Sequence, residues 1–299
     1  MMGVSLFTNS LCLLNKMKPI GIITDNSVQF PKREFPGVEL IRQIPLSISI
    51  SNKTIFDVSS TEATDLPNLT NSSNHPIIIP PTPKQLLKLL IEVKKEFEEL
   101  IILLPSNFLS PVYAQTIKSL EAIPEKNKYH LIDSCTFSFG LGILISEVAH
   151  EIYEGSSYSI IAQKIRFLIP QIFGIFCCPN LSYMDNSNFL DSPQAIALDF
   201  IGTVPIFILE DGKFSSLAKV KKMKNYLLFF EDFIDEFEQP QKIIAINGNP
   251  SRLKELKSFQ SHCDERFRRT KYSYQSMNMI TAAIIGPKAL GVFVLDNNK

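Results

Sequence analysis

The sequence predicts a two-domain α/β protein, with a doubly wound N-terminal domain and an α+β C-terminal domain that contains a mixed sheet. Three observations predict this class. The 299 residues suit two domains or one large one. Short apolar strands alternate with helices up to about residue 168, and beyond it a hairpin joins two neighbouring strands. We expect an N-terminal extension over 1–17, an α/β domain over 18–168 and an α+β domain over 169–299.

The N-terminal domain is predicted from alternating strand and helix patterns. Pro19–Thr24 is an apolar run typical of a buried parallel strand, and Ile44–Ile50 alternates like a half-exposed strand. Pro83 suits the first turn of a helix that we expect to continue to Leu100. The other expected elements are a polar loop over 57–76, strands Ile101–Leu104 and Tyr129–Asp133, a helix from about Ser110, and a helix from about Phe139 that ends near Gly155.

The C-terminal domain is predicted from strands that follow one another without a helix between them. It begins after a helix that ends near Pro170. The expected elements are a strand Ile172–Cys178, a hairpin of Val204–Leu209 and Phe214–Val220 around Glu210-Asp211-Gly212, a helix Met223–Phe237, a strand Lys242–Asn247, a helix opened by Asn249-Pro250, and strands Lys271–Met277 and Leu290–Leu295.

Composition and charge exclude several classes of protein. Thirty basic residues balance thirty acidic ones and no basic run stands out, which argues against nucleic-acid binding. No apolar window is long enough for a transmembrane segment, and the N-terminus lacks a signal-peptide pattern. The five cysteines are odd in number and form no C-x-x-C pair, so we expect reduced thiols and a cytoplasmic location.

No motif indicates catalysis, a metal or a cofactor. The chain lacks the glycine-rich phosphate loops, the H-E-x-x-H helix and the G-x-S-x-G turn. Its four histidines, His75, His130, His150 and His262, are scattered without metal-ligand spacing. The 22 phenylalanines suit an apolar cavity, although an ordinary core also explains them. A binding protein is therefore favoured over an enzyme.

Six short segments, taken in order, resemble the DegV family of bacterial fatty-acid-binding proteins. They are Thr24-Asp25-Asn26-Ser27 with Pro31, Ser106–Ser110 with Tyr113, Ile132-Asp133-Ser134, Ser138–Gly142, Leu209–Lys213 with Lys219-Val220, and Ile285–Gly291. The resemblance covers about residues 18–297 and implies the two-domain α/β fold. It also implies a carrier that buries a long acyl chain between its domains, and a fatty acid kinase as partner.

The positions that bind the ligand carboxylate in this family depart from its pattern here. The family's Thr-Ser pair falls on Ile78 and Ile79, and its histidine falls on Ile284. Its serine pair falls on Ser106 and Asn107, which keeps one hydroxyl. A buried carboxylate without hydrogen-bond donors is costly, so we expect a weaker preference for the ionised acid than in other members.

Four other sites bear on the binding prediction. Thr24, Asn26 and Ser27 are candidate loop contacts to the head group. For these residues and for Ser106, turn formation is the competing explanation. The family's basic R-K-G-G-R segment, expected to present the lipid to the kinase, falls on Asp185-Asn186-Ser187-Asn188-Phe189, so kinase docking should be weaker. One alternative is that the kinase has changed together with this segment. The other is that the kinase docks through the lysines at 219–224.

Three functions follow as hypotheses. The first is a lipid carrier for a long-chain fatty acid, without chemistry of its own. The second is a degenerate family member that acts in protein interaction or regulation without a fatty-acid ligand. The third is an enzyme of unidentified type that uses the cleft between the domains.

Overall fold

The computed structural model describes residues 18–58, 63–186, 203–221, 225–249 and 252–296. Its first sheet is parallel and consists of β1 (Lys18–Asp25), β2 (Ile41–Ile44), β6 (Phe97–Leu104) and β7 (Tyr129–Asp133), in the order β2-β1-β6-β7. The second sheet is mixed and consists of β8 (Ile172–Cys177), β9 (Val204–Glu210), β10 (Lys213–Val220), β11 (Lys242–Asn247), β12 (Lys271–Ser276) and β13 (Leu290–Leu295). Its order is β10-β9-β8-β13-β11-β12, and only the β11–β12 pair is parallel.

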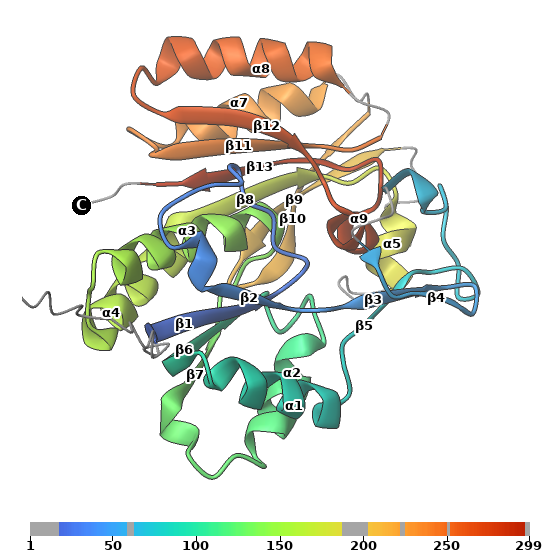
Figure 1. Ribbon diagram of the computed structural model, residues 1–299. Coiled ribbons are helices and arrows are strands. Elements are labelled where there is room, and N and C mark those ends of the chain that lie inside the picture. The colour runs from blue at the N-terminus through green and yellow to red at the C-terminus, as the bar shows by residue number, and fades with distance from the viewer. Residues whose placement is uncertain (1–17, 59–62, 187–202, 222–224, 250–251, 297–299) are drawn as a thin grey trace, which may run out of the picture.

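Helices and sheets alternate in layers (Figure 1). The helices are α1 (Pro83–Lys94), α2 (Val112–Leu120), α3 (Ser138–Tyr153), α4 (Tyr158–Leu168), α5 (Leu181–Asn186), α7 (Tyr226–Asp235), α8 (Leu253–Arg266) and α9 (Met279–Ile285). The α1–α2 pair covers the outer face of the first sheet and the α7–α8 pair covers the outer face of the second, while α3 lies between the two sheets. The predicted two-domain α/β class with a mixed second sheet is confirmed.

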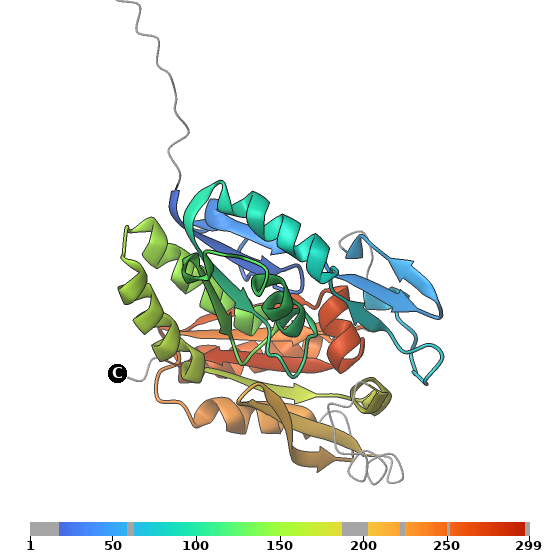
Figure 2. The same cartoon turned by 90° about the horizontal axis from the view of Figure 1, so that it is seen from below.

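A third, antiparallel sheet projects beside α9 (Figure 2). It consists of β3 (Ser47–Ile50), β4 (Lys53–Ile55) and β5 (Ile77–Ile79), in the order β4-β3-β5. The sequence patterns do not predict β4, β5, α5 or α9. The two strands are only three residues long, and the two helices are six and seven residues long. Such short elements show little periodicity.

The central helix α3 explains how the two sheets share one core. All residues from Ser138 to Ile145 are buried, on every face of the helix, because both sheets pack against α3. Gly142 has a structural role there, since a Cβ atom would lie 1.9 Å from the carbonyl oxygen of Gln29. The predicted end of the helix is confirmed: Gly155 follows the last turn with φ +83°.

Sheet pairing corrects two of the predicted elements. The helix expected over Pro83–Leu100 ends at Lys94, and the next strand begins at Phe97 instead of Ile101. Phe97 is buried against Gly21 of the adjacent strand, so pairing with β1 overrides the helical spacing. The strand expected over Ile44–Ile50 is two strands in different sheets, because Pro45 lacks the amide hydrogen that a continuous ladder needs.

The hairpin of the second sheet is confirmed. Glu210 pairs with Lys213, and the two residues between them, Asp211 and Gly212, have φ of +48° and +78°. This is the left-handed backbone that a two-residue hairpin turn requires. A smaller difference concerns α2, which begins at Val112, later than predicted. The starts predicted for the helices that follow, at Met223 and at Asn249-Pro250, fall at positions that include 223 and 250, outside the described residues. The expected extension over 1–17 lies outside the described residues.

Candidate functional site

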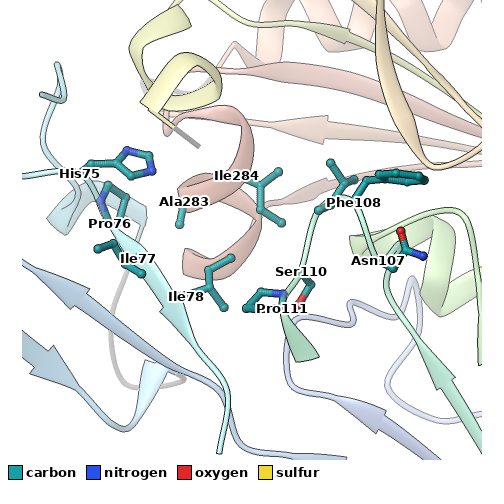
Figure 3. Close-up of a pocket in the computed structure, with 11 residues that line it drawn as sticks. His75, Pro76, Ile77, Ile78, Asn107, Phe108, Ser110, Pro111, Ala283 and Ile284 are labelled. Atoms are coloured by element: carbon teal, nitrogen blue, oxygen red, sulfur yellow. The ribbon is translucent and has the colours of Figure 1, made fainter. Parts of the chain in front are cut away.

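A pocket of about 370 Å³ opens where the small sheet, the loop after β6 and α9 meet (Figure 3). It is lined by His75, Pro76, Ile77, Ile78, Asn107, Phe108, Leu109, Ser110, Pro111, Ala283 and Ile284. Most of these side chains are apolar. The volume lies within the range of small-molecule sites, and such sites commonly combine apolar walls with a few polar groups.

The structure brings together three of the five predicted head-group positions. Ile78, Asn107 and Ile284 come from three separate elements and line the same pocket. Ile79 follows Ile78 on β5 and its side chain is 38% exposed; it is not among the lining residues. Ile77 and Ile78 both line the pocket, so the pocket meets the start of β5 and not its last residue.

Ser106, another of the five positions, does not line the pocket but bonds to the loop that does. Its side chain is fully buried and its hydroxyl donates to the carbonyl oxygen of Gly212 at 2.7 Å. The Ser106 hydroxyl oxygen accepts a hydrogen bond from the backbone N–H of Phe108 at 3.2 Å. Ser106 thus joins the loop after β6 to the β9–β10 hairpin, and its proton is already engaged within the protein.

Asn107 is exposed at one end of the pocket. Its backbone N–H donates to Oδ2 of Asp133 at 3.2 Å, and the backbone N–H of Cys135 donates to Oδ1 of the same carboxylate at 2.8 Å. Asp133 therefore orients two neighbouring loops. Burial, together with the nearby negative charges of Asp133 and Asp211, raises the pKa of the Cys135 thiol, which keeps it protonated at neutral pH.

The three loop candidates after β1 have structural roles and do not line the pocket. Asn26 holds Leu46 by two hydrogen bonds, from the Leu46 N–H to Oδ1 at 2.9 Å and from Nδ2 to the Leu46 carbonyl at 3.4 Å. Ser27 donates both its N–H and its hydroxyl to Oδ1 of Asp25. Thr24 is fully buried in the core. Burial raises the pKa of Asp25 to about 6 despite the two bonds from Ser27.

Gln29 fixes the position of α9 against α3. Its side-chain oxygen accepts hydrogen bonds from the Asn278 N–H at 2.9 Å, the Thr281 hydroxyl at 3.2 Å and the Ser138 hydroxyl at 3.1 Å. These bonds tie the loop after β1 to the first turns of two helices. The C-terminal half of α9, with Ala283 and Ile284, is thereby held at the pocket wall.

His75 is a pocket residue that sequence reasoning missed. It precedes β5 and lines the pocket at the end opposite Asn107 (Figure 3). Burial lowers the pKa of His75 below its ordinary value, so its imidazole is neutral at pH 7. The sequence places it at the end of a long polar loop, and only the unpredicted strand β5 brings it to the site.

A cation lies beside the pocket. The ammonium group of Lys213, at the start of β10, is 4.0 Å from the ring centroid of Phe108, which lines the pocket. Within the described ranges, no group of three or more His, Cys, Asp or Glu side chains could hold a metal ion. The arrangement therefore offers an apolar surface with a few hydrogen-bonding groups at its ends.

The comparison with known families gives the relationship of this chain. The model described as "Uncharacterised protein, DegV family" matches residues 19–297. The chain belongs to the DegV family. The DegV domain-containing protein TTE1491 of Caldanaerobacter subterraneus is 25% identical over 218 residues, which cover 73% of this chain and 77% of that protein.

Solved DegV structures share the fold. The fatty acid binding DegV family protein SAG1342 of Streptococcus agalactiae aligns with a TM-score of 0.79 and 19% identity, covering 94% of this chain and all of that one. The fatty acid kinase B3 protein of Streptococcus pneumoniae, loaded with linoleic acid, aligns with a TM-score of 0.79 and 15% identity over 93% of this chain. In the part of the chain that is described, no helix is long and apolar enough to span a membrane.

Proposed function

We propose that this DegV protein is a carrier for a long-chain fatty acid, with the acyl chain between its two domains and the polar head group in the pocket. The observation that carries the proposal is the convergence of Ile78, Asn107 and Ile284 on one apolar pocket. These are the positions at which the family resemblance places the head group. The solved DegV proteins that share this fold, including the one loaded with linoleic acid, support the same ligand class.

The chemistry of the pocket favours binding over turnover. Among its described lining residues, the polar side chains are those of His75, Asn107 and Ser110. The hydroxyl oxygen of Ser110 accepts from the Val112 N–H at 3.5 Å, so it helps to form the first turn of α2. With isoleucine at 78 and 284, an ionised carboxylate finds few donors, and we infer a weak preference for the ionised acid.

Thermal unfolding tests the carrier proposal. A ligand that binds only the folded state stabilises it, by about 2.7 kcal/mol at a hundredfold excess over the dissociation constant. Delipidated protein should therefore melt several degrees higher when a long-chain fatty acid is added. An unchanged melting temperature across saturated and unsaturated acids would contradict the proposal and favour the alternative of a family member without a fatty-acid ligand.

We further propose that the kinase partnership suggested by the S. pneumoniae relative is weak in this protein. The expected docking segment carries Asp185 and Phe189 where the resemblance implies basic residues; positions 187–189 lie outside the described residues. Loss of charge complementarity slows association and weakens close pairs. With a typical bacterial fatty acid kinase and ATP, acyl phosphate formation should be about tenfold slower than with an ordinary DegV carrier. Comparable turnover would contradict this, and its restoration by Asp185→Arg with Phe189→Arg would support it.

A further inference from the structure

The pocket has two chemically different ends. Asn107 lies at one end and His75 at the other, with Ile78, Ala283 and Ile284 between them (Figure 3). His75 is the one side chain with an ordinary pKa near neutrality among the described residues that line the pocket. An imidazole at the end of an apolar cavity is well suited to bind an oxygen-bearing head group, because it offers a nitrogen donor close to the bound chain.

The backbone of His75 is held in place by a hydrogen-bonded turn. Its N–H donates to the carbonyl oxygen of Asn71 at 3.0 Å. The turn is closed by side chains: the Asn71 N–H donates to Oδ1 of Asn74 at 2.7 Å, and Oδ1 of Asn71 accepts from the Ser73 N–H at 2.9 Å. Such a turn fixes the position of the residue that follows it.

The imidazole itself is supported by α5. The His75 and Tyr183 rings meet edge to face, with their centroids 6.0 Å apart. The hydroxyl of Tyr183 donates to the carbonyl oxygen of Pro67 at 2.5 Å, which ties α5 to the loop that leads to His75. The Ser182 hydroxyl oxygen accepts from the Thr70 N–H at 3.2 Å and adds a second tie. The ring is thus positioned before any ligand arrives, which lowers the entropic cost of binding.

From this geometry we infer that His75 is the specificity-determining residue of the pocket, and that it donates a hydrogen bond to the carboxyl group of the bound fatty acid. The inference rests on the proposed carrier function and adds the residue that recognises the head group. A carboxylate is a stronger acceptor than an ester carbonyl, because hydrogen bonds to charged groups are about twice as strong. Since Ile78 and Ile284 offer no donor, the weak preference for the acid over the methyl ester of the same chain comes from His75.

The test compares the affinities of palmitic acid and methyl palmitate for four proteins: wild type, His75→Ala, His75→Gln and the control His150→Ala, which removes an exposed histidine of α3. We expect His75→Ala to reduce the affinity for the acid about tenfold and to reduce that for the ester less. His75→Gln, which keeps an N–H donor, should retain part of the selectivity. His150→Ala should bind both ligands with the affinities of wild type.

In wild type, palmitic acid should also shift the imidazole proton resonances of His75 in NMR spectra and leave those of His150 unchanged.

Two results would overturn the inference while leaving the carrier proposal intact. One is an acid-to-ester affinity ratio that is the same in wild type and His75→Ala. The other is loss of that ratio in Lys213→Met and not in His75→Ala, which would assign the head group to the cation beside Phe108. If wild type binds neither palmitic acid nor its ester, the carrier proposal fails and this inference fails with it.

Discussion

The Ile78→Glu variant should bind fatty acids at least about a hundredfold more weakly than wild type. Each tenfold loss of affinity corresponds to about 1.4 kcal/mol of binding free energy. Ile78 is half-buried on β5 and lines the pocket. A glutamate there places a carboxylate in the apolar cavity that we propose receives the acid group of the ligand. Both the desolvation of that carboxylate and the repulsion between two like charges oppose binding.

Ile79→Glu is the matched control for this substitution. Ile79 lies next to Ile78 on the same strand, but its side chain is 38% exposed and does not line the pocket. The control carries the same added charge and should bind fatty acids within about twofold of wild type, since an exposed substitution changes free energies by only about 0.5 kcal/mol. Calorimetric titration of delipidated proteins measures both affinities. Equal losses in the two variants, or full binding by Ile78→Glu, would contradict the placement of the site.

Relative to wild type, the Asp25→Asn variant should be more stable at pH 8 than at pH 4. Asp25 is fully buried at the end of β1, and within the described ranges its carboxylate receives hydrogen bonds only at Oδ1, both from Ser27. Burial raises the pKa of this carboxyl from 3.8 to about 6. The folded wild type therefore contains an ionised group that it accommodates poorly at alkaline pH, whereas asparagine carries no charge at any pH.

The direction of the effect follows from proton linkage. Below pH 4 the carboxyl of Asp25 is mostly protonated in both the folded and the unfolded state. Between pH 4 and pH 6 the folded state binds the proton more tightly than the unfolded state does. The wild-type protein therefore loses stability as the pH rises through this range. The two pKa values differ by about 2, which corresponds to about 3 kcal/mol. The other groups titrate alike in wild type and variant, so they cancel in the difference.

Urea unfolding at pH 4, 6 and 8 measures this difference. The free energy of unfolding of Asp25→Asn minus that of wild type should increase by about 3 kcal/mol between pH 4 and pH 8. Ser27→Ala serves as a second variant, because it removes the hydroxyl donor to Asp25 and should enlarge the pH dependence. A difference in unfolding free energy between Asp25→Asn and wild type that is the same at all three pH values would contradict the raised pKa of Asp25.

Much of the fold could be predicted from the sequence because its main signals are local. Short apolar runs predict the buried strands β1, β11 and β13. Asp211-Gly212 adopts the positive φ angles that a two-residue hairpin turn needs. The helix boundary at Lys94 could not be predicted, since Phe97 fits the helical spacing as well as a strand. Only its pairing with β1 decides between the two, and that pairing is not local.

The site could be predicted only in part. The family resemblance indicated Ile78, Asn107 and Ile284, and the structure brings them to one pocket. It also indicated Ile79 and Ser106, which do not line that pocket: Ile79 is the last residue of β5, and the Ser106 hydroxyl is buried against Gly212. His75 had no signal of its own. Its position depends on the turn before it and on Tyr183, more than a hundred residues along the chain.

Native mass spectrometry of the full chain, purified from bacterial cells without added detergent, tests the carrier claim most directly. If the protein is a fatty-acid carrier, its mass should exceed that of the chain by one long-chain fatty acid, and lipid extraction should release that acid in about equimolar amount. Incubation of delipidated protein with palmitic or oleic acid should restore the same increment. A mass equal to the chain alone, both after purification and after incubation with these acids, would contradict the account.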